Sequence, residues 1–121
     1  MKLHKVQEQW RAYNSQHFSG LLRPVRIQIT RSSANYGKFV YPVKHGACEP
    51  VIHISGCINT EDTWRDALLH EMIHQFLYES RIEEDDIHGP IFVEWATKLG
   101  VSLDFDGAPK NVTIQASEAK S

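Results

Sequence analysis

Two histidines four residues apart, with a glutamate directly after the first, are the residues of this chain best placed to do chemistry. They are His70 and His74, with Glu71 beside them. On an α-helix this spacing puts both imidazoles on one face, one turn apart, where they can share a metal ion. Glu71 would lie next to that face and could accept a proton from a water bound to the ion. The pattern therefore predicts metal-assisted hydrolysis.

A catalytic zinc ion usually takes three protein ligands and leaves one position to water, so the pair needs a partner. His88 precedes a further predicted helix, and Glu94 lies within that helix. Sequence spacing leaves both candidates open. Tyr41 and Tyr78 are candidate donors to a developing oxyanion, although either could equally be a packed aromatic residue.

The elements that must position these residues follow from apolar periodicity. Apolar residues at three- and four-residue steps predict a first helix from Leu3 to about Ser19, and Asn59-Thr60 offers an N-cap for the helix that carries the motif. Proline at position 90 suits the first turn of a last helix, which Gly100 can end. Strands are predicted near residues 25–30, 38–43 and 51–54. Their short connections favour a small, mainly antiparallel three-stranded sheet, and the whole an α+β fold.

Length and composition predict one domain. The chain has 121 residues, of which 41% are apolar, enough for a single core over residues 1–106, with a flexible polar tail at 107–121. No apolar run approaches the ~18 residues that cross a bilayer, and the start of the chain is polar. Cys48 and Cys57 form no C-x-x-C pair. We therefore expect a cytoplasmic protein with no membrane partner and with reduced thiols.

Charge is unevenly distributed along the chain. Residues 60–86 hold nine acidic residues against two basic ones, whereas residues 21–45 hold no acid. The basic residues of the 21–45 segment are Arg23, Arg26, Arg31, Lys38 and Lys44. Such a segment can contact nucleic acid or an acidic partner, or can simply be solvated surface.

Two motifs and their surroundings resemble the SprT-like (Spartan-type) zinc metalloprotease domain. The pattern H-E-x-x-H at residues 70–74 is followed by H-G-x-x-F at residues 88–92, across an acidic spacer. Residues 18–25 resemble that family's entry into its first strand, and residues 51–55 its last strand before the catalytic helix. The resemblance covers about residues 5–103.

The resemblance implies a zincin-like minimal fold and a set of roles. His70, His74 and His88 would bind one catalytic Zn²⁺, and Glu71 would be the general base for hydrolysis of peptide bonds. It also implies substrates that are bound or crosslinked to DNA, cleavage that DNA stimulates, and a place in the cytoplasm or on the nucleoid. Larger relatives append a cysteine zinc ribbon or partner-binding tails, which these 121 residues lack.

Two other functions compete with a protease. One is a catalytically silent zinc-containing domain that binds DNA or acts as an adaptor, and the other is zinc-dependent hydrolysis of a non-protein amide. Retention of Glu71 argues against the first, because three histidines suffice to hold a metal. His53 could line a substrate cleft at the sheet, or could be an outward strand residue.

Overall fold

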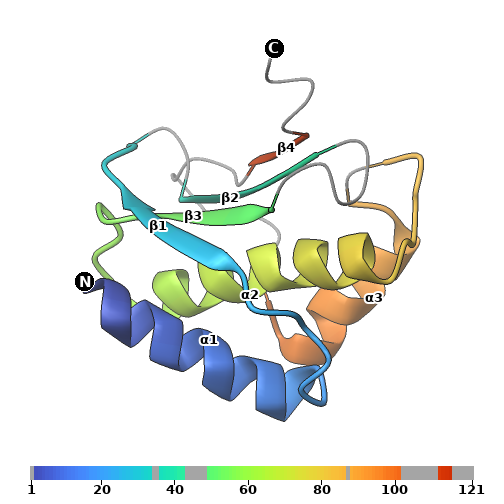
Figure 1. The fold of residues 1–121 in the computed structure, drawn as a ribbon, viewed down its shortest axis with the longest axis horizontal. Coiled ribbons are helices and arrows are strands. Elements are labelled where there is room, and N and C mark those ends of the chain that lie inside the picture. Colours follow the sequence, from blue (N-terminus) through green and yellow to red (C-terminus); the bar gives the residue numbers. More distant parts are fainter. Residues whose placement is uncertain (1, 34–35, 43–48, 87, 102–111, 116–121) are drawn as a thin grey trace.

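The described helices all lie on one side of a four-stranded sheet (Figure 1). The computed structural model describes residues 2–33, 36–42, 49–86, 88–101 and 112–115. The elements run α1 (Leu3–His17), β1 (Arg26–Thr30), β2 (Gly37–Tyr41), β3 (Val51–Ser55), α2 (Glu61–Glu79), α3 (Pro90–Leu99) and β4 (Val112–Gln115). The predicted α+β class is confirmed. Within the described ranges, no helix is long and apolar enough to span a bilayer.

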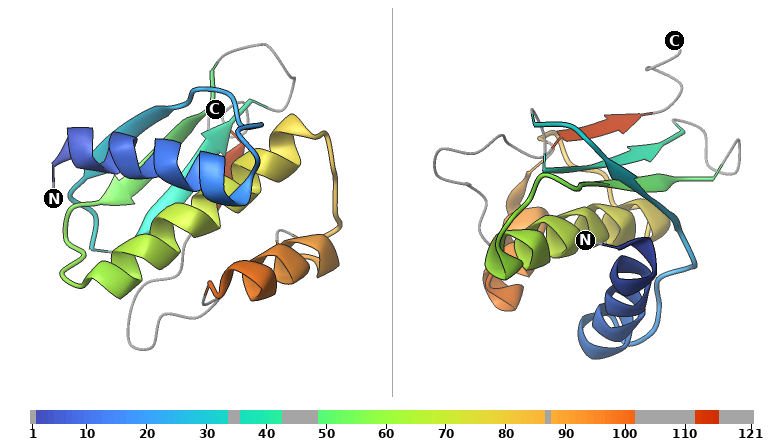
Figure 2. Two further views of the ribbon diagram at one scale, coloured as in Figure 1. Left: turned by 90° about the horizontal axis from the view of Figure 1, so that it is seen from below. Right: turned by 90° about the vertical axis from the view of Figure 1, so that its left-hand side faces the viewer.

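The helices form one layer and the sheet the other. Figure 2 shows all three described helices on the same side of the sheet, with α2 directly beneath the strands. Ile52 and Ile54 of β3 and Phe39 of β2 are fully buried toward this helical layer. Because side chains alternate along a strand, Lys38 and His53 point to the opposite face, which no described helix covers.

The sheet differs from the predicted three-stranded, mainly antiparallel one: it has four described strands, in two parallel pairs and one antiparallel pair. The strands lie in the order β1-β3-β2-β4, so β3 stands between the two strands that precede it in the chain. β3 is parallel to β1 and antiparallel to β2. Short connections suggested that consecutive strands are neighbours in the sheet. A short connection limits how far apart two strands can lie, but it does not decide which strand takes the centre. The most apolar strand, with Ile52 and Ile54 fully buried, takes that place.

Part of the predicted tail joins this sheet. Val112–Gln115 forms β4, which pairs with β2 in parallel, so that Lys38 lies opposite Val112. These four residues therefore differ from the expected flexible tail, and the rest of residues 107–121 lies outside the described ranges. Lys44 and Cys48 also lie outside them.

α2 is the centre of the molecule. It contacts β2, β3 and α3, and almost all of its residues from Ala67 to Leu77 are buried. The helix begins as predicted at the Thr60 cap, whose hydroxyl oxygen accepts a hydrogen bond from the Thr63 N–H at 3.3 Å. The sheet and the neighbouring helices enclose this helix, so His70, Glu71 and His74 are buried as well as its apolar residues.

A buried glutamine connects α2 to α1 and to the segment that leads into β1. The Gln75 amide nitrogen donates to the Arg23 carbonyl oxygen at 2.8 Å and to a Glu79 carboxylate oxygen at 2.6 Å. Its amide oxygen accepts from the Trp10 indole N–H at 3.2 Å. These contacts fix the rotation of α2 beside His74, since a buried amide has few alternative partners.

Candidate metal centre

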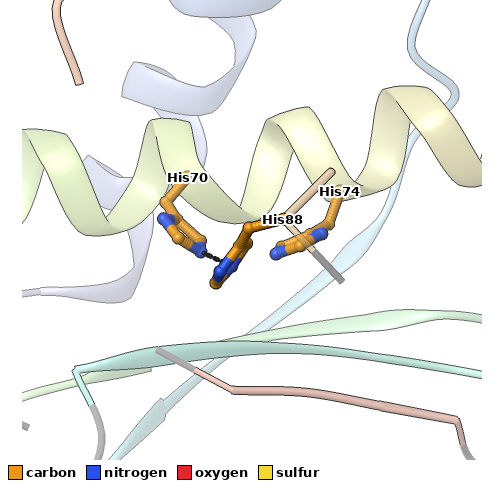
Figure 3. A group of neighbouring side chains, drawn as sticks. All are labelled: His70, His74 and His88. Carbon is orange, nitrogen blue, oxygen red and sulfur yellow. Dashed lines mark hydrogen bonds between the residues drawn. The ribbon is translucent and has the colours of Figure 1, made fainter. Parts of the chain in front are cut away.

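Three imidazoles converge between α2 and α3. His70 and His74 come from consecutive turns of α2, and His88 comes from the turn immediately before α3 (Figure 3). One ring nitrogen from each lies within 4.8 Å of the others. The Nε2 atoms of His70 and His88 are 3.0 Å apart. His88 lies fourteen positions after His74 in the sequence, and the fold brings it into one cluster with the two histidines of α2.

A phenylalanine supports the cluster from α3. The Phe92 ring lies 4.8 Å from the His70 ring, 4.5 Å from the His74 ring and 4.7 Å from the His88 ring, centroid to centroid. Phe92 is fully buried. The sequence showed Phe92 only as the last residue of the H-G-x-x-F pattern. In the structure its ring restricts the orientation of all three imidazoles, as packed apolar shells do around metal ligands.

Glu71 is buried beside the cluster and against β2. Its side chain is 0% exposed. A Cβ added to Gly37 would lie 3.1 Å from Glu71 Oε2 and 3.2 Å from its Cγ. Gly37 thus leaves the room that the carboxyl group occupies. Sequence reasoning missed this residue, although a glycine inside a strand often marks such a close approach.

Burial sets the protonation of these groups. Burial lowers the pKa of His70 to about 3, with His88 as a smaller cause. Burial also lowers the pKa of His74 well below its ordinary value, and the neighbouring His70 and His88 add to that shift. The imidazoles of His70 and His74 are therefore neutral, the form that binds metal. Burial raises the pKa of the Glu71 carboxyl well above its ordinary value.

The donor set fits a metal ion. His70 Nδ1, His74 Nε2 and both Glu71 carboxylate oxygens are buried and have no hydrogen-bond partner among the described residues. Buried polar atoms without partners are rare and often mark a functional site. An imidazole nitrogen is a preferred ligand of zinc, and three such ligands are typical of a catalytic site. His70, His74 and His88 are the residues that would hold the ion.

The other predicted site residues lie outside this cluster. Glu94 is exposed on α3. Tyr41 and Tyr78 pack against each other, with ring centroids 4.9 Å apart, and both contact Phe39. His53 lies on the face of the sheet away from α2, opposite Lys38.

The basic residues that the sequence grouped together separate in space. Arg26 is exposed and Lys38 half-buried, on the helix-free face of the sheet. Arg23 and Arg31 are exposed in the segments that flank β1. The histidine cluster lies beneath the opposite face, so any partner of the strand residues would be separated from it by the sheet.

The comparisons with known proteins agree with this geometry. The sequence profile of the SprT-like family matches residues 6–116. Searches of curated proteins and of solved structures gave no significant match.

Proposed function

The chain belongs to the SprT-like family, and from this premise we propose that it is a zinc-dependent metallopeptidase. His70, His74 and His88 hold the ion, and Glu71 is the general base. The observation that carries the proposal is the convergence of two buried imidazoles and one half-buried imidazole beside a buried carboxyl group that has no hydrogen-bond partner among the described residues. A structural zinc site needs four protein ligands and no such base.

The residues divide the work of peptide hydrolysis between them. When bound, zinc supplies a water of lowered pKa and polarises a carbonyl group. Glu71 accepts a proton from the attacking water and returns it to the leaving amine. Phe92 keeps the imidazoles in place and limits water around them, and the Gly37 backbone fixes the position of the Glu71 carboxyl group.

Glu71→Gln tests the proposal, because it keeps the shape of the side chain and removes the base. We expect zinc binding to persist and peptide hydrolysis to fall by about a hundredfold or more. Glu94→Gln, on the exposed face of α3, is the matched control and should cleave like the parent. If Glu71→Gln cleaves at the parental rate, the enzyme proposal fails and the alternative of a silent zinc-containing adaptor replaces it.

We further propose that the substrates are proteins bound to DNA, which would place the enzyme on the nucleoid. Support comes from the exposed basic side chains around β1 and from Lys38 on the helix-free face. Arg26→Glu with Lys38→Glu should weaken DNA binding and flatten its dependence on salt. Arg11→Glu, exposed on α1, is the control. If the rate at which a DNA-bound protein is cleaved depends on neither DNA nor salt, the proposal of DNA-bound substrates fails, while the proposal of a metallopeptidase stands.

A further inference from the structure

A carboxylate in the acidic spacer caps the helix that follows the third histidine. The Glu84 carboxylate accepts hydrogen bonds from the backbone N–H groups of Ile91 at 2.7 Å and Phe92 at 3.3 Å. The residue at the N-cap position of α3 is Gly89, which has no side chain to do this. A carboxylate at a helix N-terminus satisfies free N–H groups and is favoured by the helix dipole. Glu84 therefore takes the place of the missing cap.

Gly89 makes room for that carboxylate. Its backbone has φ −75° and ψ −173°, which any residue can adopt, so backbone conformation does not require glycine here. A Cβ on Gly89 would lie 2.7 Å from Glu84 Cδ and under 3.0 Å from both carboxylate oxygens. An alanine would thus push the carboxylate away from α3. The glycine of the H-G-x-x-F pattern has a steric purpose in this chain.

The contacts of Glu84 reach the histidine cluster through its two neighbours. His88 directly precedes Gly89, against which the carboxylate packs. The carboxylate also accepts a hydrogen bond from the Phe92 N–H, and the Phe92 ring contacts all three imidazoles. We infer that Glu84 is a positioning residue that holds His88 and Phe92 in the arrangement that binds metal. This inference rests on the proposed zinc site.

Metal affinity measured by chelator competition separates positioning from simple stabilisation. We expect Glu84→Ala to lower the zinc affinity of the folded protein about tenfold, within the range for residues that support ligands. Glu84→Asp should recover part of the loss. Glu83→Ala, an exposed neighbour in the same segment, should stay within twofold of the parent. Unchanged affinity in Glu84→Ala, with only a lower Tm, would overturn the inference.

A double-mutant cycle tests the steric link. Gly89→Ala alone should lower zinc affinity about as much as Glu84→Ala, because the methyl group displaces the same carboxylate. In the Glu84→Ala background, where no carboxylate remains to be displaced, Gly89→Ala should change affinity by less than twofold. Losses that multiply instead would show that the two residues act independently and would overturn the inference.

A metal-free readout distinguishes failure of this inference from failure of the proposed zinc site. The ring nitrogens of His70 and His88, 3.0 Å apart, should show altered NMR shifts in metal-free Glu84→Ala and unaltered shifts in Glu83→Ala. If the parent binds no zinc but these shifts follow Glu84, the zinc proposal fails and the positioning role stands. If the NMR shifts are the same in Glu84→Ala and in the parent, the positioning role is contradicted, whether or not the parent binds zinc.

Discussion

At the scale of single residues, the site depends on a few close approaches that composition does not reveal. Gly37 gives Glu71 its space, and Gly89 gives Glu84 its space. In both cases a glycine permits a carboxylate to sit against the backbone at a point where the proposed chemistry needs it. Side-chain volume at these two positions is therefore expected to control function more strongly than it controls folding.

Gly37→Ala should reduce peptide hydrolysis at least tenfold while zinc remains bound. The added methyl group would meet the Glu71 carboxyl group at 3.1 Å, and small displacements of a catalytic group are costly. Gly56→Ala is the matched control, since its Cβ would be equally close to Ile29 but far from the base. Equal activities in the two variants would show that Gly37 has no part in placing Glu71.

Acid should destabilise the metal-free protein. The pKa values of His70 and His74 are lowered by burial, so below about pH 6.5 the unfolded chain binds protons that the folded chain does not. The free energy of unfolding then falls as pH falls, by at most about 1.4 kcal/mol per pH unit for each histidine. The raised pKa of Glu71 acts in the opposite direction, because the folded protein keeps a proton that the unfolded chain has released.

Urea unfolding of the metal-free protein between pH 7.5 and pH 5.5 measures this balance. We expect stability to decline toward the acid end, and to decline more steeply in Glu71→Gln, which lacks the opposing carboxyl group. His4→Gln, at an exposed position of α1, is the control. A flat profile in Glu71→Gln, where no buried carboxyl group opposes them, would mean that the two buried imidazoles are protonated as easily as in the unfolded chain.

At the scale of elements, the helices were largely predictable and the sheet was not. Local signals define helix ends: Thr60 caps α2, Pro90 starts α3, and Gly100 ends it with φ +70°. The position of β3 between β1 and β2 depends on contacts distant in sequence, which no local pattern encodes. Similarly, spacing left His88 and Glu94 open, and only the fold shows which of them lies beside His70 and His74.

The Thr60 cap should contribute measurably to α2. Thr60→Ala removes the side-chain acceptor for the Thr63 N–H and should lower the free energy of unfolding by about 1 kcal/mol. Because the cap lies at the far end of α2 from His74, zinc affinity of the folded protein should not change. A large loss of zinc affinity with an unchanged free energy of unfolding would contradict this prediction, because it would mean that Thr60 acts on the histidine cluster and not on the stability of α2.

At the scale of the whole molecule, the chain is a two-layer domain whose central helix is buried on both sides. The sheet covers α2 from one side, and the other helices cover it from the other (Figures 1 and 2). This enclosure lowers the pKa values of His70 and His74 and raises the pKa of Glu71. Arg26 and Lys38, which we propose contact DNA, lie on the face of the sheet that no described helix covers.

Metal stoichiometry tests the central claim most directly. Native mass spectrometry of the parent, His88→Ala and Glu94→Ala, each loaded with zinc and then exposed to the same weak chelator, compares the two candidate ligands in one experiment. The geometry predicts one zinc ion in the parent and in Glu94→Ala, and loss of the ion in His88→Ala. Retention of zinc by His88→Ala together with its loss from Glu94→Ala would contradict the three-histidine site.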